Sequence, residues 1–111
     1  GLPLSLEGIR ICNDKGAIYL VLDRKLRLIP NVSVYQRIFR DEVHKIMTET
    51  EFKSYKAHIG HKLPVECELI KDSSSGNVYL LDTIDGDTIV KRVITGPPVM
   101  DKYSFDWDKT T

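Results

Sequence analysis

Two stretches of the chain are rich in apolar β-forming residues. They run over residues 17–30 and 77–95, and each has turn-forming residues near its middle. The two stretches are also similar in sequence, with a tyrosine near the start and an arginine near the end of each. The aligned residues are Tyr19 with Tyr79, Arg27 with Arg92, and Ile29 with Ile94. The pattern predicts two β-hairpins, one in each half of the chain.

The turn residues predict how the strands of each hairpin pair. In the second stretch Asp85-Gly86 lies between β-forming residues, and a two-residue turn there places Tyr79 opposite Arg92. In the first stretch we expect Tyr19 opposite Arg27, which leaves a three-residue loop between the strands. Alternate residues then share a face of the sheet. The faces expected in the core consist of Ile18, Leu20, Leu26 and Leu28 in the first hairpin and Val78, Leu80, Ile89 and Val93 in the second.

Each predicted hairpin is followed by residues that start a short helix. Asn31 and Ser33 are typical helix caps, and Pro97-Pro98 suits the first turn of a helix in the second half. After the first hairpin the apolar residues have the spacing of one helical stripe, namely Val34, Tyr35, Ile38 and Phe39. We therefore expect each hairpin to be followed by a short helix that packs back on its sheet.

The segment between the hairpins contains one further helix signal. Thr48 followed by Glu51 is a capping box, and it predicts a helix that runs as far as Gly60. Together these elements predict an α+β fold in a single domain, residues 1–111, which is long enough for one core. Within it we expect two pseudo-symmetric repeats, each a β-hairpin plus a short helix, that share this core. Unit one covers about residues 7–60 and unit two about 61–108.

The second unit resembles a tandem repeat found in bacterial secreted and cell-surface proteins. That repeat reads Tyr-Leu, a turn, Lys-Arg-x-Ile, a proline and a short helix ending in Phe-x-Trp. The matching residues here are Tyr79-Leu80, Lys91-Arg92-x-Ile94 and Phe105-x-Trp107. The first unit matches through Tyr19-Leu20 and Arg27-x-Ile29-Pro30, but it has Asp23-Arg24 where the repeat has Asn-Gly, and it lacks the tryptophan. The resemblance implies a non-enzymatic, secreted or cell-surface recognition unit, and it does not supply a ligand.

Composition and charge exclude several classes of partner. The 111 residues carry 16 Lys and Arg against 16 Asp and Glu, and zero net charge argues against sequence-independent binding of nucleic acid. No apolar run reaches the roughly 18 residues that a membrane span needs. The charge is divided unevenly, because residues 1–60 carry ten basic and seven acidic residues whereas residues 61–111 carry six and nine. The opposite charges, +3 and −3, favour self-association of copies or the orientation of a partner.

Two groups of residues have the types that metal sites use. His58, His61 and Cys67 are spaced as three zinc ligands, but no close second pair completes a tetrahedron. Asp82, Asp85 and Asp87 carry the oxygens that calcium prefers, but a dedicated calcium loop has more ligands at closer spacing. No arrangement of a nucleophile with a base is discernible in the sequence. We therefore expect no metal, no cofactor and no catalytic residue.

The two cysteines, Cys12 and Cys67, lie in β-type segments. Burial as thiols and pairing as a disulfide are both compatible with such positions, because the sequence does not give the distance between them. The sequence leaves this choice open.

The repeated tyrosine–arginine pairs are the strongest candidates for a binding site. Aromatic rings stack on sugar rings while arginine donates directed hydrogen bonds. The expected ligand-binding residues are Tyr19, Arg27, Tyr79, Arg92 and Trp107. The alternative is that each arginine stacks on its tyrosine and braces the fold.

Two functions are consistent with these features. The first is a non-catalytic recognition module for carbohydrate or another cell-surface component. The alternative is a protein-interaction module without sugar binding, such as an inhibitor or a toxin-associated subunit. That module would use an exposed sheet edge or the polar tips of the hairpins.

Overall fold

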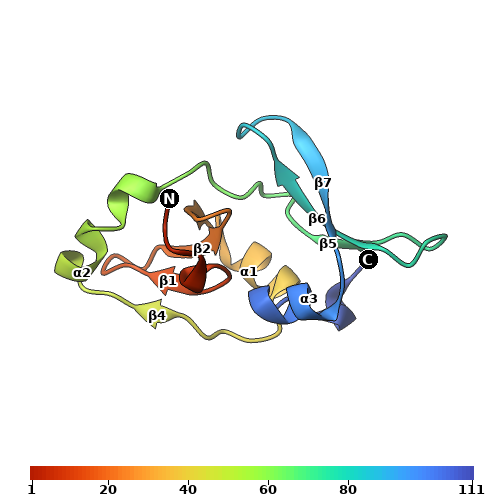
Figure 1. Ribbon diagram of the computed structural model, residues 1–111, viewed down its shortest axis with the longest axis horizontal. Helices are drawn as coiled ribbons and strands as arrows, with labels where there is room; N and C mark the ends of the chain where they lie inside the picture. Colours follow the sequence, from red (N-terminus) through yellow and green to blue (C-terminus); the bar gives the residue numbers. More distant parts are fainter.

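The computed structural model describes residues 1–111 as a mixed α+β structure with two β-sheets and three α-helices (Figure 1). The expectation of an α+β fold is confirmed at this level. The first sheet has the order β3-β2-β1-β4 and consists of β1 (Arg10–Cys12), β2 (Ile18–Leu22), β3 (Lys25–Leu28) and β4 (Lys45–Ile46). The second has the order β5-β6-β7 and consists of β5 (Leu69–Lys71), β6 (Val78–Thr83) and β7 (Ile89–Ile94).

The helices are short and connect or cover the sheets. The α-helices are α1 (Val32–Ile38), α2 (Glu49–Lys53) and α3 (Pro97–Tyr103), and single 3-10 turns occur at Leu4–Leu6, Lys56–His58 and Trp107–Lys109. Figure 1 shows α1 and α3 close together in the middle of the molecule, with α2 at the end away from the second sheet. No helix has the length and apolar character that crossing a bilayer requires.

The first hairpin has a two-residue turn, so the expected three-residue loop is wrong. Asp23 and Arg24 both have positive φ angles, 55° and 62°, as a type I′ turn requires. Neither residue favours this conformation, but the carboxylate of Glu7 accepts hydrogen bonds from both of their backbone N–H groups, at 2.7 and 2.8 Å. Because Glu7 lies outside the hairpin, the sequence of the hairpin does not reveal this support.

The second hairpin has a longer loop than the Asp85-Gly86 turn that the sequence predicts. The N–H of Ile84 bonds to the carbonyl of Thr88 at 3.1 Å, so three residues form the loop between them. The Asp85 carboxylate accepts the N–H groups of Asp87 and Thr88, and Gly86 takes a positive φ of 94°. The side-chain hydrogen bonds of Asp85 stabilise this longer loop.

Each hairpin is therefore paired one residue away from the expected register. Arg27 lies opposite Leu20 and Arg92 opposite Leu80, while Tyr19 faces Leu28 and Tyr79 faces Val93. Side chains alternate between the two faces of a sheet. When the pairing of two strands shifts by one residue, side chains that were expected on the same face therefore lie on opposite faces. The predicted pairing of each tyrosine with an arginine is wrong, and so are the core faces built on it.

The burial of the side chains follows the observed register. Leu20 packs in the larger core, whereas Leu26 packs in a separate cluster on the opposite face of the sheet. Ile89 and Val93, which were expected in the core, are 45% and 55% exposed. The second hairpin instead buries Val78, Leu80 and Ile94.

The helices after the hairpins form where the sequence predicts them. The Asn31 side chain caps α1 by accepting the N–H of Val34 at 2.9 Å, and α3 begins with Pro97 after Gly96. The predicted apolar stripe of α1 is buried throughout, at Val34, Tyr35, Ile38 and Phe39. These residues fix α1 against the core, as the periodicity predicts.

The helix predicted between the two hairpins, α2, is shorter than expected. The capping box of Thr48 and Glu51 is present with both of its hydrogen bonds, which confirms the predicted start. However, α2 ends at Lys53, and a separate 3-10 turn leads towards Gly60. Apolar residues are too sparse over residues 53–60 to hold a continuous helix against the sheet.

The larger core draws on both halves of the chain. It contains Leu20, Ile29 and the α1 stripe from the first half and Leu63, Leu69, Leu80, Met100 and Phe105 from the second, among others. Phe39 and Phe105 meet in its centre, with ring centroids 5.7 Å apart and a short antiparallel backbone bridge. The second, smaller cluster belongs to the first half alone and consists of Leu2, Ile11, Val21, Leu26, Met47 and Phe52.

Candidate functional site

The five residues predicted to bind a ligand make contacts other than the predicted tyrosine–arginine pairs. The ring of Tyr19 packs on Phe52, with centroids 5.4 Å apart, and the ring of Tyr79 lies beneath the Lys91 ammonium at 5.1 Å. Trp107 is 42% exposed in the last 3-10 turn. Arg27 and Arg92 point to the other face of their hairpins. The structure therefore does not form the tyrosine–arginine pairs on which a sugar site was predicted.

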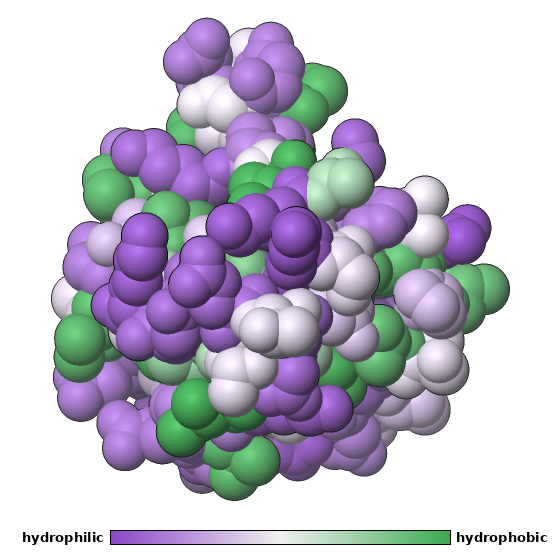
Figure 2. All heavy atoms as spheres, turned by 90° about the vertical axis from the view of Figure 1, so that its left-hand side faces the viewer, coloured by the Kyte–Doolittle hydropathy of each residue, from purple (hydrophilic) through white to green (hydrophobic).

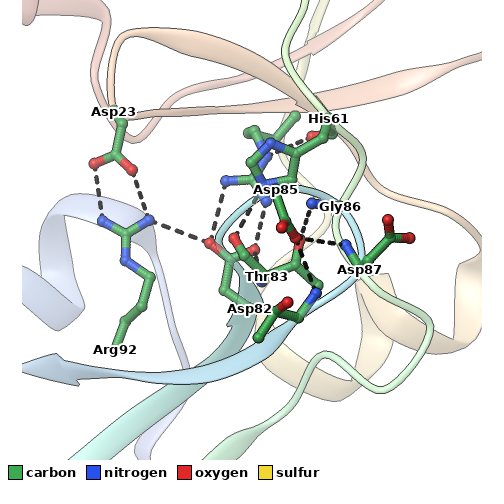
Figure 3. Close-up of polar contacts among 10 residues, drawn as sticks. Asp23, His61, Asp82, Thr83, Asp85, Gly86, Asp87 and Arg92 are labelled. Atoms are coloured by element: carbon green, nitrogen blue, oxygen red, sulfur yellow. Dashed lines mark hydrogen bonds and ion pairs between the residues drawn. The ribbon is translucent and has the colours of Figure 1, made fainter.

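The two arginines instead meet in an arginine–aspartate cluster of Asp23, Arg27, Asp82 and Arg92. Arg27 donates to both carboxylate oxygens of Asp82, which is only 1% exposed. Arg92 donates to both oxygens of Asp23, at 2.7 and 2.8 Å, and to Asp82 at 3.2 Å (Figure 3). Each arginine thus reaches an aspartate of the other hairpin. The cluster joins the two halves, which favours a bracing role for the arginines.

The charge state of Asp82 follows from its partners. Burial alone would raise the pKa of its carboxyl, but hydrogen bonds from Arg27, from the Thr83 N–H and from Arg92 outweigh burial and lower that pKa. Hydrogen bonding to Asp23, the largest influence, raises the pKa of Arg92. Asp82 is therefore ionised and fully paired, and it is not part of a solvated acidic tip.

The residues considered for metal binding are held by internal contacts. Asp85 uses its carboxylate on loop N–H groups, and a ring nitrogen of His61 lies 3.0 Å from the carbonyl of Thr83 (Figure 3). Cys12 and Cys67 are both buried and unpaired, so they are thiols. Burial raises the pKa of Cys67 to about 12, which leaves it protonated and unreactive. The structure contains no group of three or more His, Cys, Asp or Glu side chains placed to hold a metal ion.

A different surface is available on the second sheet. Its inner face contacts the larger core through Leu69, Val78, Leu80 and Ile94. On its outer face six residues, which we term the bare face, are half-buried or exposed, namely Ile70, Tyr79, Leu81, Ile89, Lys91 and Val93. Thr83, at the loop end of the same face, is buried, and Glu68 lies beside Leu81 just before β5. Five of the six side chains of the bare face are apolar or aromatic, and no helix or loop forms a buried cluster with them. Such a continuous apolar face is typical of a surface that binds a partner.

The outer edge of β7 borders the bare face and has unpaired backbone groups. Hydrogen-bonded and non-hydrogen-bonded pairs alternate in an antiparallel ladder. Since Ile84 and Thr88 are hydrogen-bonded, the pairs Asp82–Val90 and Leu80–Arg92 are bonded too. The N–H and C=O groups of Ile89, Lys91 and Val93 therefore point away from β6. We term these groups the open edge; no other strand lies beside β7 (Figure 1).

The other sheet edges are covered or very short. The carbonyls of Leu26 and Leu28 in β3 accept the N–H groups of Gly60 and Leu63. The edge of β5 pairs with Thr111, which bonds to both Leu69 and Lys71. The remaining edge strand, β4, has only two residues. The open edge of β7 is the longest one available for pairing.

A groove at the other side of the molecule is the second candidate site. It has a volume of about 620 Å³ and lies between the β1–β2 turn, the start of α1 and the segment that follows α1. Its apolar lining includes Ile18 and Ile29, and its polar lining consists of Lys15, Asn31, Tyr35, Glu42 and His44. The size and the mixture of groups suit a small ligand with several hydroxyls.

A buried hydrogen-bond chain orients the polar groups of this groove. Arg10 donates to the Tyr35 hydroxyl at 3.0 Å, and that hydroxyl lies 3.2 Å from His44 Nδ1. Because arginine only donates, the Tyr35 hydroxyl accepts from Arg10, and its contact with His44 Nδ1 extends the chain to the groove. Burial, the largest influence, raises the pKa of Tyr35 and keeps it protonated. His44 therefore lines the groove with a ring that its hydrogen bond with Tyr35 helps to orient.

The sequence contained one signal for the open edge that the predicted register concealed. Lys91 lies beside Arg92 between the apolar pairs of the run Ile89–Ile94, and a lysine among the apolar residues of a strand is typical of an edge strand. With the register shifted by one residue, Lys91 faces the bare side. The groove had no comparable signal, because its lining comes from three separate segments.

Comparisons with known proteins do not identify the chain. No protein-family model, no curated protein and no solved structure matches it.

Proposed function

We propose that this domain is a non-catalytic recognition module that binds an extended segment of another protein along the open edge of β7. The observation that supports this most is the combination of the open edge with the bare face. Each alone is common, but a strand added at β7 satisfies the free backbone groups and covers apolar side chains at the same time. On this proposal the domain is secreted or lies at the cell surface, as its resemblance to the bacterial repeat implies.

The internal structure of the domain supports this use of β7. The edge lies at the end of a sheet whose inner face is anchored in the larger core, so a partner would pair with a rigid strand and little ordering entropy would be lost on the domain's side. The cluster of Asp23, Arg27, Asp82 and Arg92 also ties the second hairpin to the first.

A second candidate function is the binding of carbohydrate, at the groove and not at the predicted tyrosine–arginine pairs. The observation that favours it is the groove's polar lining, where His44, Asn31 and Glu42 can bond to hydroxyl groups. On this hypothesis a glycan array gives specific binding that His44→Ala weakens. Val93→Pro, on the far sheet, leaves that binding unchanged.

We also propose that the two halves are pseudo-symmetric repeats. The backbone contacts around Phe39 and Phe105 are reciprocal, with the N–H of Arg40 bonded to the carbonyl of Ser104 and the N–H of Asp106 bonded to the carbonyl of Ile38. The two arginines likewise bond to aspartates across the halves. An experimental structure tests the proposal by superposition of residues 18–39 on residues 78–105. Arginines at non-equivalent positions would contradict it.

The proposed function can be tested with a library of random linear peptides selected against the immobilised domain. We expect selected peptides to lose binding to the Val93→Pro variant by about tenfold or more, since proline removes an outward N–H and obstructs the edge. The N–H of Val93 is outside the β6–β7 ladder, so the fold tolerates this proline.

The matched control is Val93→Thr, which retains the N–H and should retain binding. Thermal unfolding of both variants confirms that they are folded. Selected peptides that bind Val93→Pro as well as the wild type would contradict the proposal, and so would a selection that yields no binding peptide.

A further inference from the structure

We infer that the strand accepted at β7 carries an acidic residue opposite Lys91, with apolar residues two positions before and after it. This inference rests on the proposed function and names the chemistry of the partner. It follows from which side chains border the open edge, from their charges and from the cross-strand geometry of an added strand.

The open edge determines which partner residues lie beside which side chains. Ile89, Lys91 and Val93 direct their backbone groups outward and their side chains onto the bare face. A strand that pairs with them places alternate side chains on the same face, directly across from these three. Apolar residues fit opposite Ile89 and Val93, because both are exposed beside other apolar side chains.

Lys91 is the one cation of the bare face, and it takes part in none of the ion pairs of the molecule. Its neighbours Tyr79, Leu81 and Ile70 carry no charge. Glu68 lies on the same side of the sheet just before β5, beyond Leu81 and away from the open edge. The Lys91 ammonium lies over the Tyr79 ring. A carboxylate on the partner, opposite Lys91, would complement this charge and would be partly shielded from water by the apolar residues around it.

The second cation of β7 is already paired. Arg92 points to the opposite face and bonds to Asp23 and Asp82 (Figure 3). It therefore has less capacity to attract a further carboxylate, and the preference for an acidic residue is specific to the position opposite Lys91.

A second copy of this chain is a poorer occupant than a different protein. A twofold antiparallel pairing that uses the whole open edge is centred on Lys91 and places two ammonium groups opposite each other. Like charges directly across a pair of strands destabilise it. Lysine in this position also protects the edge against aggregation with copies of itself.

The test uses three blocked peptides that contain Val-Thr-Glu-Thr-Val, Val-Thr-Gln-Thr-Val or Val-Thr-Lys-Thr-Val between identical polar ends. Binding is measured by NMR titration of the whole domain, followed at the Lys91 and Val93 amides. We expect the glutamate peptide to bind about three- to tenfold more tightly than the lysine peptide, with glutamine between them. The preference should weaken as the salt concentration is raised.

The decisive variant is Lys91→Glu, which should reverse the order so that the lysine peptide binds best. If all three peptides bind equally and all lose binding to Val93→Pro, the acidic preference is wrong while the proposed function stands. If none binds at millimolar concentration and the peptide library also yields nothing, the proposed function itself is overturned. Size-exclusion chromatography tests for self-association. If the domain forms a dimer that Val93→Pro abolishes, the strand paired with β7 belongs to a second copy of the chain, and the inference is contradicted.

Discussion

The two sheets of this domain differ in how completely the chain covers them. The first sheet is buried on both faces, with the larger core on one side and a second cluster around Val21, Leu26 and Phe52 on the other. The second sheet has the larger core on one face and solvent on the other. Figure 2 shows the end of the molecule near α2, where hydrophilic residues predominate and hydrophobic ones occur in separate small groups.

The difference arises from segments outside the hairpins. The N-terminal segment contributes Leu2 to the second cluster, and the connection between the halves contributes Met47 and Phe52. No segment of this kind lies over the second sheet. On its outer face the ring of Tyr79 contacts the Lys91 ammonium, whereas in the first sheet the ring of Tyr19 packs on Phe52. Similar hairpins therefore have different roles: one is closed by its own chain, and the other leaves a surface for a partner.

The largest effect should come from removing the cover of the first sheet. Phe52→Ala deletes a ring that is 3% exposed and packs on Tyr19, and we expect a loss of about 3–5 kcal/mol in the free energy of unfolding. The matched change on the second sheet, Val93→Ala, should alter stability by only about 0.5 kcal/mol. Urea unfolding of both variants measures the contrast. Equal losses would show that the outer face of the second sheet is packed as tightly as that of the first.

Arg27→Ala should cost about 3 kcal/mol, because it leaves the buried carboxylate of Asp82 with only Arg92 as a charged partner. The control is Arg40→Ala, which breaks the exposed ion pair with Asp101 and should cost less than about 1 kcal/mol. Urea unfolding distinguishes the two. A loss below 1 kcal/mol for Arg27→Ala would contradict the role of the cluster in joining the halves.

The turns of the two hairpins should respond differently to the loss of a carboxylate. Glu7→Gln weakens the hydrogen bonds to Asp23 and Arg24 and the one donated by the Tyr103 hydroxyl. We expect about 1–2 kcal/mol of destabilisation. The corresponding Asp85→Asn in the second loop should cost less, since that carboxylate is exposed. Thermal unfolding of the two variants checks the order, and the reverse order would contradict it.

Acid should destabilise the domain partly through Asp82. The pKa of its carboxyl is lowered in the folded state, so on acidification the unfolded chain takes up this proton before the folded protein does. The stabilisation that the ionised carboxylate provides is therefore lost as the pH falls below about 4 and through the lowered pKa. The largest slope from one such group is about 1.4 kcal/mol per pH unit. Asp82→Asn should start less stable at neutral pH and lose stability less steeply in acid. Denaturant unfolding at several pH values tests this, and parallel curves for the two proteins would contradict it.

Local patterns predicted the type and position of most elements. The stripe on α1, the capping box of Thr48 and the two hairpins all depend on residues close together in the sequence. The strand register could not be predicted in this way, because the first turn depends on Glu7 and the second on which N–H groups Asp85 binds. An error of one residue was enough to exchange the faces and to pair each arginine with the wrong residue.

The candidate sites depend even more on distant contacts. The opposite charges of the two halves were expected to favour self-association or to orient a partner. In the structure part of that charge is paired internally, between Arg27 and Asp82 and between Arg40 and Asp101, whereas the pair of Arg92 with Asp23 has the opposite sense. The groove and the bare face also depend on which segments the chain folds over each hairpin. The one local signal was Lys91, whose position in an apolar strand indicates an edge.

Amide hydrogen exchange along β7 tests the central claim most directly. In the free domain the N–H groups of Lys91 and Val93 should exchange rapidly, while those of Val90 and Arg92, which bond to β6, should be protected. Addition of the glutamate-containing peptide should slow exchange at Lys91 and Val93 and leave Val90 and Arg92 unchanged. Equal protection at all four amides in the free domain, or no slowing at Lys91 and Val93 with the peptide in excess, would contradict the account.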